Sequence, residues 1–472
     1  MGVRMLKKFI GYIMQSVAGM IGISIYVLAD TFFISVQSGT DGLAVLNLIL
    51  PVYGVMYAIG AMIGIGSATR YRLNRAKGEA SDRYFGQSLE WNLLFSVPFM
   101  LCGLLAAKPL MELLGADERL TALGIPYLRI VLSGAPFFMC NYTFTAFARN
   151  DHAPAVAMWA SIAGSMFNIV FDYVLMFPMG MGFAGAALAT ALSPVVTMAV
   201  CAVHFRSRRS QVTVRFTKLS ASGLVSCCKL GISAFVGEIS SAVITIVFNM
   251  LILGLAGNVG VAAYGVAANI SMVGMCIFNG LAQGTQPMIS DCYGKGQQDM
   301  VKKLLTWALA ICGALKLLMV AAIWLWTDGM VGIFNTEQDL KLLAYAHTGL
   351  RLYGLGFLAA GINILLAASF CCGSCKTGNC RLCPERRCGN HHLRHCVVQN
   401  LWAERCLAVL FVLRGDHPGG DRSSGKAGKT KSAGEAERDH GIKFKKRFFE
   451  KHGKHIDFFM KISIINLQIR NK

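Results

Sequence analysis

The sequence has little charge: 15% of its 472 residues are Asp, Glu, Lys or Arg, whereas 54% are hydrophobic. A soluble protein of this size needs about a quarter of its residues charged to cover its surface, so soluble enzyme classes are largely excluded. Acids are especially scarce, at 25 against 45 Lys and Arg. In a membrane protein this excess indicates cytoplasmic loops rather than a nucleic-acid partner.

The sequence also lacks a short N-terminal apolar stretch followed by a small-residue cleavage site, so the first apolar run is expected to remain as a signal anchor. Long apolar runs fill the chain up to residue 370 and predict an all-α polytopic membrane protein. The predicted spans are residues 9–35, 43–67, 86–107, 122–147, 154–177, 183–206, 226–254, 259–284, 302–326 and 347–370.

The loops between these spans alternate in charge. Lys and Arg gather at the N-terminus and in the loops 68–85, 205–225 and 295–303. They are absent from the alternate loops 36–42, 178–182 and 255–258. By the positive-inside rule, this alternation predicts a cytoplasmic N-terminus.

An internal repeat relates the two halves of the chain. Gly66 precedes the pair Lys77-Gly78 by the same spacing that separates Gly284 from Lys295-Gly296. Two halves of equal orientation are typical of transporters with a pathway between two lobes, although two glycine-rich helix ends can also be similar by chance. The predicted domains are a six-helix lobe at 1–206, a linker at 207–225, a four-helix lobe at 226–370 and a tail at 371–472.

Few ionisable residues lie within the predicted spans, and such residues are functional candidates by default. Asp30, Asp172 and Thr190 lie on three different spans at the same depth, roughly 8–10 Å below the outer surface at ~1.5 Å per residue. Asn168 shares a helix face with Asp172, and Tyr26 shares one with Asp30. Each acid alone could instead be an interfacial residue that reaches water.

These oxygen-bearing side chains suit a Na⁺ ion, and two neighbouring carboxylates repel one another and so favour the retention of a proton. Either ion could be coupled to transport. Glu238 is the one acid deep within the spans of the second half, and it fits either a second coupling group or a structural carboxylate.

The chain resembles the multidrug and toxic compound extrusion (MATE) transporters, especially the bacterial branches. The resemblance covers residues 1–370 and is carried by the order and spacing of YVLADTFFI from Tyr26, LAVLNLILP from Leu43, GIGSATRY from Gly64, NIVFD from Asn168, GMGFAGAALAT from Gly180 and QGTQP from Gln283. It implies two six-helix lobes in a bacterial inner membrane. It also implies alternating access, with small drugs or organic cations exported by a monomer as H⁺ or Na⁺ enters.

The resemblance further implies that Asp30, Asn168, Asp172 and Thr190 form the cation site and that Tyr26 lines the same cavity. No cofactor beyond the coupling ion, no metal site and no nucleic-acid partner is expected, and membrane lipid surrounds the protein. The chain departs from the family pattern in three respects. The first span has no proline, residues 347–370 contain no acid to pair with Glu238, and the last two helices are missing.

The tail from Cys371 is basic and rich in cysteine and histidine. Its Cys-x₂-Cys pairs beside His391, His392 and His395 have zinc-site spacing. A frameshift is the favoured interpretation, because reading these codons one nucleotide late turns every Cys codon into Val or Ala and permits sequences like the two missing helices. An unstructured basic tail is the third interpretation.

Two alternatives to a drug antiporter remain. A lipid flippase of similar architecture is disfavoured, because the first eight spans carry no Arg or Lys deep within them for a phosphate. A membrane-embedded enzyme is disfavoured, because no paired-acid metal motif or nucleophile–base constellation is present. A chain truncated by two helices is also expected to be unstable or inactive, since surfaces that pack against them would lose their partners.

Overall fold

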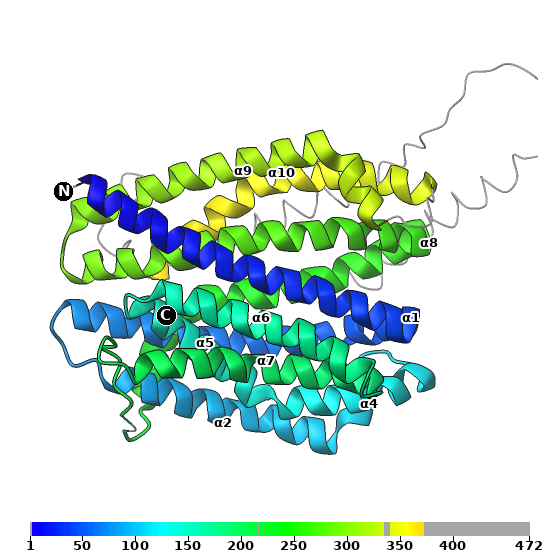
Figure 1. Ribbon diagram of the computed structural model, residues 1–472, viewed down its shortest axis with the longest axis horizontal. Helices are drawn as coiled ribbons and strands as arrows, with labels where there is room; N and C mark the ends of the chain where they lie inside the picture. Colours follow the sequence, from blue (N-terminus) through cyan, green and yellow to red (C-terminus); the bar gives the residue numbers. More distant parts are fainter. Residues whose placement is uncertain (1, 216, 335–339, 372–472) are drawn as a thin grey trace, which may run out of the picture.

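The computed structural model describes residues 2–215, 217–334 and 340–371, and the secondary-structure elements in these ranges are all α-helices (Figure 1). The predicted all-α class is confirmed, whereas the tail from residue 372 lies outside the described residues. The helices are α1 Gly2–Ala76, α2 Arg83–Leu105, α3 Ala107–Leu113, α4 Glu118–Ser133, α5 Ala135–Asn150, α6 Pro154–Met176, α7 Gly182–Phe205, α8 Ala221–Gly294, α9 Gln298–Phe334 and α10 Leu340–Cys371.

Most predicted spans correspond to these helices, and α6 and α7 agree with their predicted limits to within one residue. Within the described part of the chain, eight helical segments are long and apolar enough to cross a membrane, if the parts of α1 before and after Gly39 are counted separately. The number is nine if α4 and α5 form one bent span. The remaining predicted span, 259–284, lies within α8. The division into a six-helix lobe and a four-helix lobe stays a prediction.

Two of the predicted loops are wrong, and one predicted span is bent. The loop expected at 36–42 is a one-residue break at Gly39, where a φ of 58° lets the chain kink inside α1. The loop expected at 255–258 lies within the helical range of α8. The span predicted at 122–147 is two helices that bend by 44° around Gly134, because Pro136 in the first turn of α5 cannot continue α4.

The helices begin and end at two opposite ends of the bundle. The N-terminus, the turn after α1, the α5–α6 junction, the linker after α7 and the α8–α9 turn lie at one end (Figure 1). These segments include the loops that the charge pattern places in the cytoplasm. Gly78 and Gly296, which are equivalent in the repeat, both end their helices with left-handed φ values of 78° and 73°. We refer to this end as the basic end.

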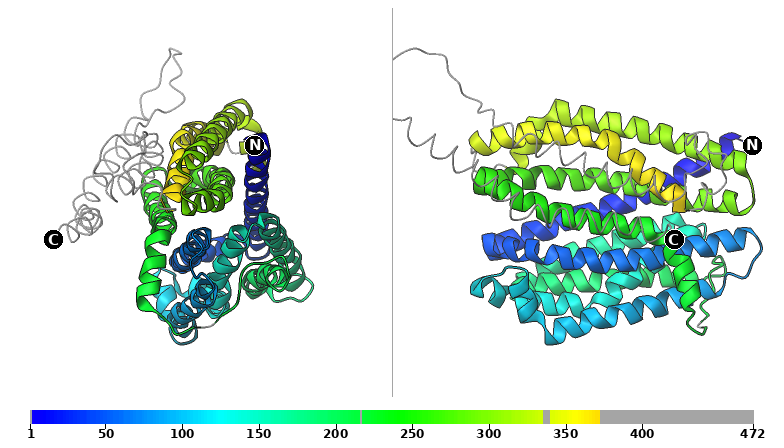
Figure 2. Two further views of the ribbon diagram at one scale, coloured as in Figure 1. Left: turned by 90° about the vertical axis from the view of Figure 1, so that its left-hand side faces the viewer. Right: turned by 180° about the vertical axis from the view of Figure 1, so that it is seen from behind.

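At the basic end, α1 and α8 cross reciprocally. A Cβ atom on Gly66 of α1 would collide with the backbone of Cys227 in α8, and one on Gly284 of α8 would lie 2.8 Å from the Cα atom of Ile13 in α1. The end-on view shows the first parts of α1 and α8 on opposite sides of the molecule, between its two groups of helices (Figure 2). Each half of the repeat therefore inserts one helix against the other half.

The crossings explain why glycine stands at both positions. We expect Gly66→Ala to lower the free energy of unfolding by about 1–3 kcal/mol, because the added methyl group forces two helix backbones apart. Gly11→Ala is the matched control, since a Cβ atom at Gly11 meets nothing within 4 Å. Thermal unfolding in detergent measures both. Equal midpoints for the two variants would contradict the close crossing.

Candidate functional site

The structure brings the predicted cation-site residues together from three helices. Asp30 comes from α1, Asn168 and Asp172 from α6, and Thr190 from α7. All four are buried, with exposed fractions of 7%, 0%, 0% and 8% in that order. The Asn168 amide donates a hydrogen bond from Nδ2 to Thr190 Oγ1 at 3.2 Å, which joins α6 to α7.

Several oxygens of this cluster have no hydrogen-bond donor among the described residues. Oδ1 of Asp30, Oδ1 of Asn168 and both carboxylate oxygens of Asp172 are buried and have no hydrogen-bond partner among the described residues. The carboxyl groups of Asp30 and Asp172 lie within contact range of each other. Two adjacent carboxylates without donors are unfavourable in a buried site unless a proton or a metal cation neutralises them.

Tyr26 lies beside this cluster on α1. Its phenol is within electrostatic range of Asp30 and Asp172, and also of Cys276 on α8. The cluster therefore borders both halves of the repeat. Tyr26 thus lies next to the acids and close to α8, whereas its role in lining a transport cavity stays a prediction.

A group of tyrosines that the sequence analysis did not single out extends from the cluster. The hydroxyls of Tyr53 and Tyr127 are 3.3 Å apart. The Tyr57 ring lies 5.8 Å from that of Phe138 and 6.0 Å from that of Tyr142, with edge-to-face geometry. Tyr53 and Tyr57 are four residues apart within one span, so their shared helix face was a signal that could have found them.

Glu238 on α8 faces these same aromatic side chains. It lies within electrostatic range of Tyr57, Tyr142 and Cys276. The structure thus brings Glu238 to the first half of the repeat, next to the tyrosines. Aromatic faces bounded by acids at two sites are a suitable lining for an organic cation.

An ion-pair cluster connects α1 to α8 at the basic end. Arg72 of α1 has an exposed fraction of 4%, and its guanidinium lies 2.8 Å from Asp291 of α8. Lys295 also reaches Asp291, at 2.9 Å. The sequence analysis counted Arg72 only as a loop cation, because a partner more than two hundred residues away leaves no local pattern.

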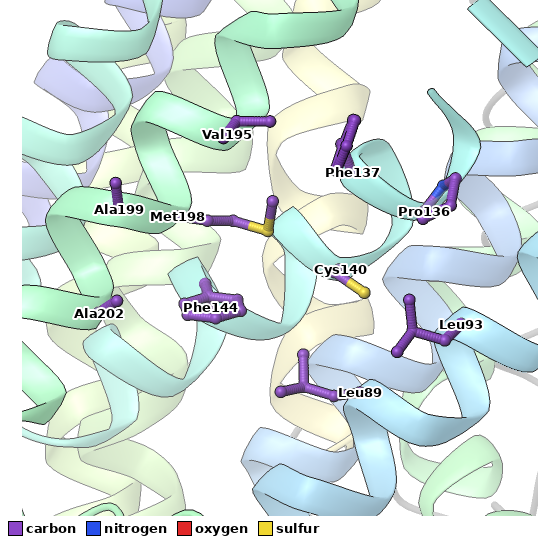
Figure 3. A pocket seen from close by; sticks show the side chains of 10 residues that line it. All are labelled: Leu89, Leu93, Pro136, Phe137, Cys140, Phe144, Val195, Met198, Ala199 and Ala202. Atoms are coloured by element: carbon purple, nitrogen blue, oxygen red, sulfur yellow. The ribbon is translucent and has the colours of Figure 1, made fainter. Parts of the chain in front are cut away.

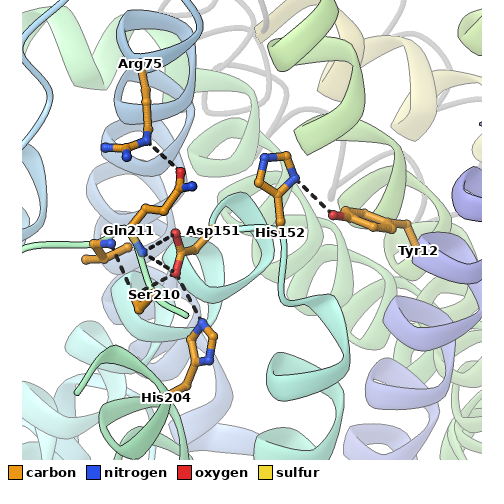
Figure 4. Close-up of polar contacts among 8 residues, drawn as sticks. Tyr12, Arg75, Asp151, His152, His204, Ser210 and Gln211 are labelled. Carbon is orange, nitrogen blue, oxygen red and sulfur yellow. Dashed lines mark hydrogen bonds and ion pairs between the residues drawn. The ribbon is translucent and has the colours of Figure 1, made fainter. Parts of the chain in front are cut away.

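Asp151, at the junction of α5 and α6, holds the linker that follows α7 (Figure 4). Its carboxylate accepts hydrogen bonds from Ser210 Oγ at 2.7 Å and from the Gln211 backbone N–H at 3.0 Å. His204 Nε2 lies 3.2 Å from the same carboxylate. The linker predicted at 207–225 is therefore fixed to the first half of the repeat at its start.

His152 forms a second contact at this junction. Its Nδ1 lies 3.2 Å from the Tyr12 hydroxyl (Figure 4), and Arg72 contacts its Nε2. Because a guanidinium can only donate, Nε2 is the acceptor and Nδ1 carries the proton. Burial of the ring, together with the positive charges of Arg72 and Lys8, lowers the pKa of His152 to about 4.

This pKa predicts a pH-dependent stability. As pH falls from about 6.5 toward 4, the unfolded chain gains a proton at His152 before the folded protein does, so stability that is complete above pH 6.5 is lost. We expect a smaller drop in unfolding midpoint between pH 7 and pH 5 in His152→Asn than in the wild type. Asparagine suits the φ of 61° at this position. Identical drops would show that another group causes the pH effect.

A separate apolar cavity of about 410 Å³ lies between α2, α5 and α7 (Figure 3). Its lining is Leu89, Leu93, Pro136, Phe137, Cys140, Phe144, Val195, Met198, Ala199 and Ala202. None of the predicted site residues is among them. Leu93 and Phe137 are exposed, so we assign this cavity to the lipid-facing surface and not to the cation site.

Comparison with known proteins finds related sequences. A family model described as MatE matches residues 16–174 and 234–373. The multidrug export protein MepA of Staphylococcus saprophyticus is 27% identical over 351 residues, which are 72% of this chain and 76% of the relative. MepA of Staphylococcus aureus is 28% identical with the same coverage.

Solved structures show the same fold. A MOP superfamily transporter from Pyrococcus furiosus superposes with a TM-score of 0.75 at 23% identity, covering 86% of this chain and 88% of that one. An outward-facing multidrug resistance transporter of the MATE family gives a TM-score of 0.73 at 23% identity, covering 87% and 94%. The expected resemblance of the fold to MATE transporters is thus confirmed.

Proposed function

The chain belongs to the MatE family of multi-pass membrane transporters and is not an enzyme, and we propose that it is a cation-coupled antiporter that exports organic cations. One observation carries the coupling proposal. Four buried oxygens of Asp30, Asn168 and Asp172 lie together, and none of them has a hydrogen-bond donor within the described part of the chain. A cluster of this kind binds H⁺ or Na⁺.

The export cycle follows from competition for negative charge. With the ion bound, the acid cluster has one negative charge fewer, so it attracts a cationic drug less strongly. When the ion leaves, the carboxylates attract the drug toward Tyr26 and the tyrosines beside Glu238. Because ion and drug favour opposite charge states of the same region, entry of one promotes release of the other.

The charge pattern of the loops indicates which end of the protein faces the cytoplasm. We propose that the basic end faces the cytoplasm of a bacterial cell, that the protein lies in the inner membrane as a monomer, and that the crossings of α1 and α8 close the cytoplasmic side. The Arg72–Asp291 ion pair supports this closure, since it joins the two helices at that end. Opening toward the cytoplasm requires this contact to separate.

Transport by the purified full-length chain in proteoliposomes tests the proposal. Ethidium movement is followed by fluorescence under an imposed pH gradient, an imposed Na⁺ gradient, or neither. We expect uphill ethidium movement with one gradient and its collapse when an ionophore dissipates that gradient. Movement that is indifferent to both gradients would refute coupling, and scrambling of labelled phospholipid in its place would identify a flippase.

A further inference from the structure

A second cavity, of about 600 Å³, lies between the last turns of the α1 helix and the first turns of α8. It lies at the basic end, next to the crossing of α1 and α8 at which Gly66 contacts Cys227. Its polar lining comes from Arg70 on α1 and from Ser222, Ser226 and Lys229 on α8. The rest of the lining is Ala221, Val225 and Leu230.

Within the described ranges of the chain, the cations of this cavity have no acidic partner. Among the described residues, neither Arg70 nor Lys229 forms a salt bridge, and the buried Nε of Arg70 has no hydrogen-bond partner. No Asp or Glu lines the cavity. Arg83 adds a third positive charge nearby, because it and Arg70 both lie within electrostatic range of Cys227.

The start of α8 adds to the positive potential. Ser220 caps this helix by accepting a hydrogen bond from the Gly223 backbone N–H at 3.1 Å, so Ser222 lies in the first turn. The partial positive charge of a helix N-terminus favours an anion at this position. Two side-chain cations, two hydroxyls and the helix end therefore surround one cavity.

The other side of the cavity is apolar and open. Val225 is 53% exposed on the outer surface of α8, and Leu230 lines the cavity one helical turn further along. Ala221–Ser241 is apolar enough to cross a membrane, so Val225 lies near the boundary between the lipid tails and the basic end. A ligand that fits both sides has a phosphate head and a hydrocarbon tail.

We propose that this cavity binds the phosphodiester head group of an anionic phospholipid of the inner leaflet. Arg70 and Lys229 neutralise the phosphate, Ser222 and Ser226 donate hydrogen bonds to it, and the acyl chains run along Val225. The bound lipid joins α1 to α8 beside their crossing. It therefore stabilises the state in which the two halves of the repeat are closed at the basic end.

Thermal unfolding of the detergent-solubilised full chain tests this without any transport measurement, so the result is independent of the proposed coupling. Phosphatidylglycerol, phosphatidylcholine and inorganic phosphate are titrated separately. We expect phosphatidylglycerol alone to raise the unfolding midpoint, with apparent affinity about fivefold weaker in Lys229→Gln and weaker again in Arg70→Gln/Lys229→Gln. Lys302→Gln/Lys303→Gln on α9 is the matched control, because it removes two positive charges at the same end.

Four outcomes would overturn the proposal. Equal stabilisation by phosphatidylcholine would remove the need for a charged head group, and equal stabilisation by inorganic phosphate would indicate a free-anion site. An equal loss in the Lys302→Gln/Lys303→Gln control would indicate general attraction to anionic lipid. Lys229 is exposed, so Lys229→Gln is expected to fold even if the double variant does not, and unchanged affinity in it would also refute the site.

Discussion

The Asp172→Asn variant is expected to fold and to export no drug above the background of vesicles without protein. Asp172 is fully buried, and both of its carboxylate oxygens lack hydrogen-bond partners among the described residues. An amide of nearly the same shape removes the negative charge that attracts the coupling ion. The loss should be near complete, because Asp30 alone no longer presents two adjacent carboxylates.

The measurement is gradient-driven ethidium movement in proteoliposomes, with the amount of inserted protein and the unfolding midpoint determined for each variant. Asp299→Asn is the matched control, since the Asp299 side chain is 95% exposed at the start of α9. Removal of an uncompensated buried charge should leave the midpoint of Asp172→Asn equal to or above that of the wild type. Export by Asp172→Asn at the control rate would show that the acid cluster is not the coupling site.

Asn168→Ala separates ion binding from packing. Its amide bridges α6 to α7 through Thr190, while its carbonyl oxygen has no partner. A role as an ion ligand predicts that higher Na⁺ or lower pH partly restores export, because a weaker site fills at higher ion concentration. A purely structural role predicts a lower unfolding midpoint and no such rescue.

The convergence of the four residues proposed to form the cation site could be predicted because it depends on two regularities of membrane helices. The rise per residue sets the depth of a side chain below the surface, and the 3.6-residue period sets its face. Asp30, Asp172 and Thr190 share a depth, and Asn168 shares a face with Asp172. The limits of α6 and α7 were predictable for another reason: each helix is a long apolar run that starts at a proline or a glycine, Pro154 and Gly182.

Contacts between distant helices could not be predicted in the same way. The Arg72–Asp291 ion pair depends on how α1 crosses α8, and a single sequence contains no distance between two spans. The break at Gly39 was missed because one glycine with positive φ can replace the loop that an apolar-run analysis expects. The placement of Glu238 beside Tyr57 and Tyr142 likewise follows from helix packing and not from any local pattern.

Asp291→Asn is expected to destabilise the protein strongly, because it leaves the buried Arg72 guanidinium without the carboxylate that neutralises its charge. Arg72 has an exposed fraction of 4%, and loss of one member of a buried pair costs about 3–5 kcal/mol. Asp291 itself is 20% exposed, so the lower end of this range applies. The double variant Arg72→Met/Asp291→Asn should recover much of the loss, since it leaves no buried unpaired charge. Lys295, which also loses Asp291 as a partner, is 48% exposed and can be solvated by water.

The Lys302–Asp299 pair is the internal control. Its atoms are 3.8 Å apart and its side chains are 59% and 95% exposed, so breaking it should cost less than about 1 kcal/mol. Thermal unfolding of the Asp299→Asn, Asp291→Asn and double variants gives the comparison. If Asp291→Asn were no more destabilising than Asp299→Asn, the ion pair would not hold α1 against α8. If Asp291→Asn is more destabilising and ethidium also leaks through its vesicles without a gradient, the Arg72–Asp291 pair helps to close the proposed cytoplasmic side. The leak would be the sign, because a pathway that is open at both ends cannot sustain uphill export.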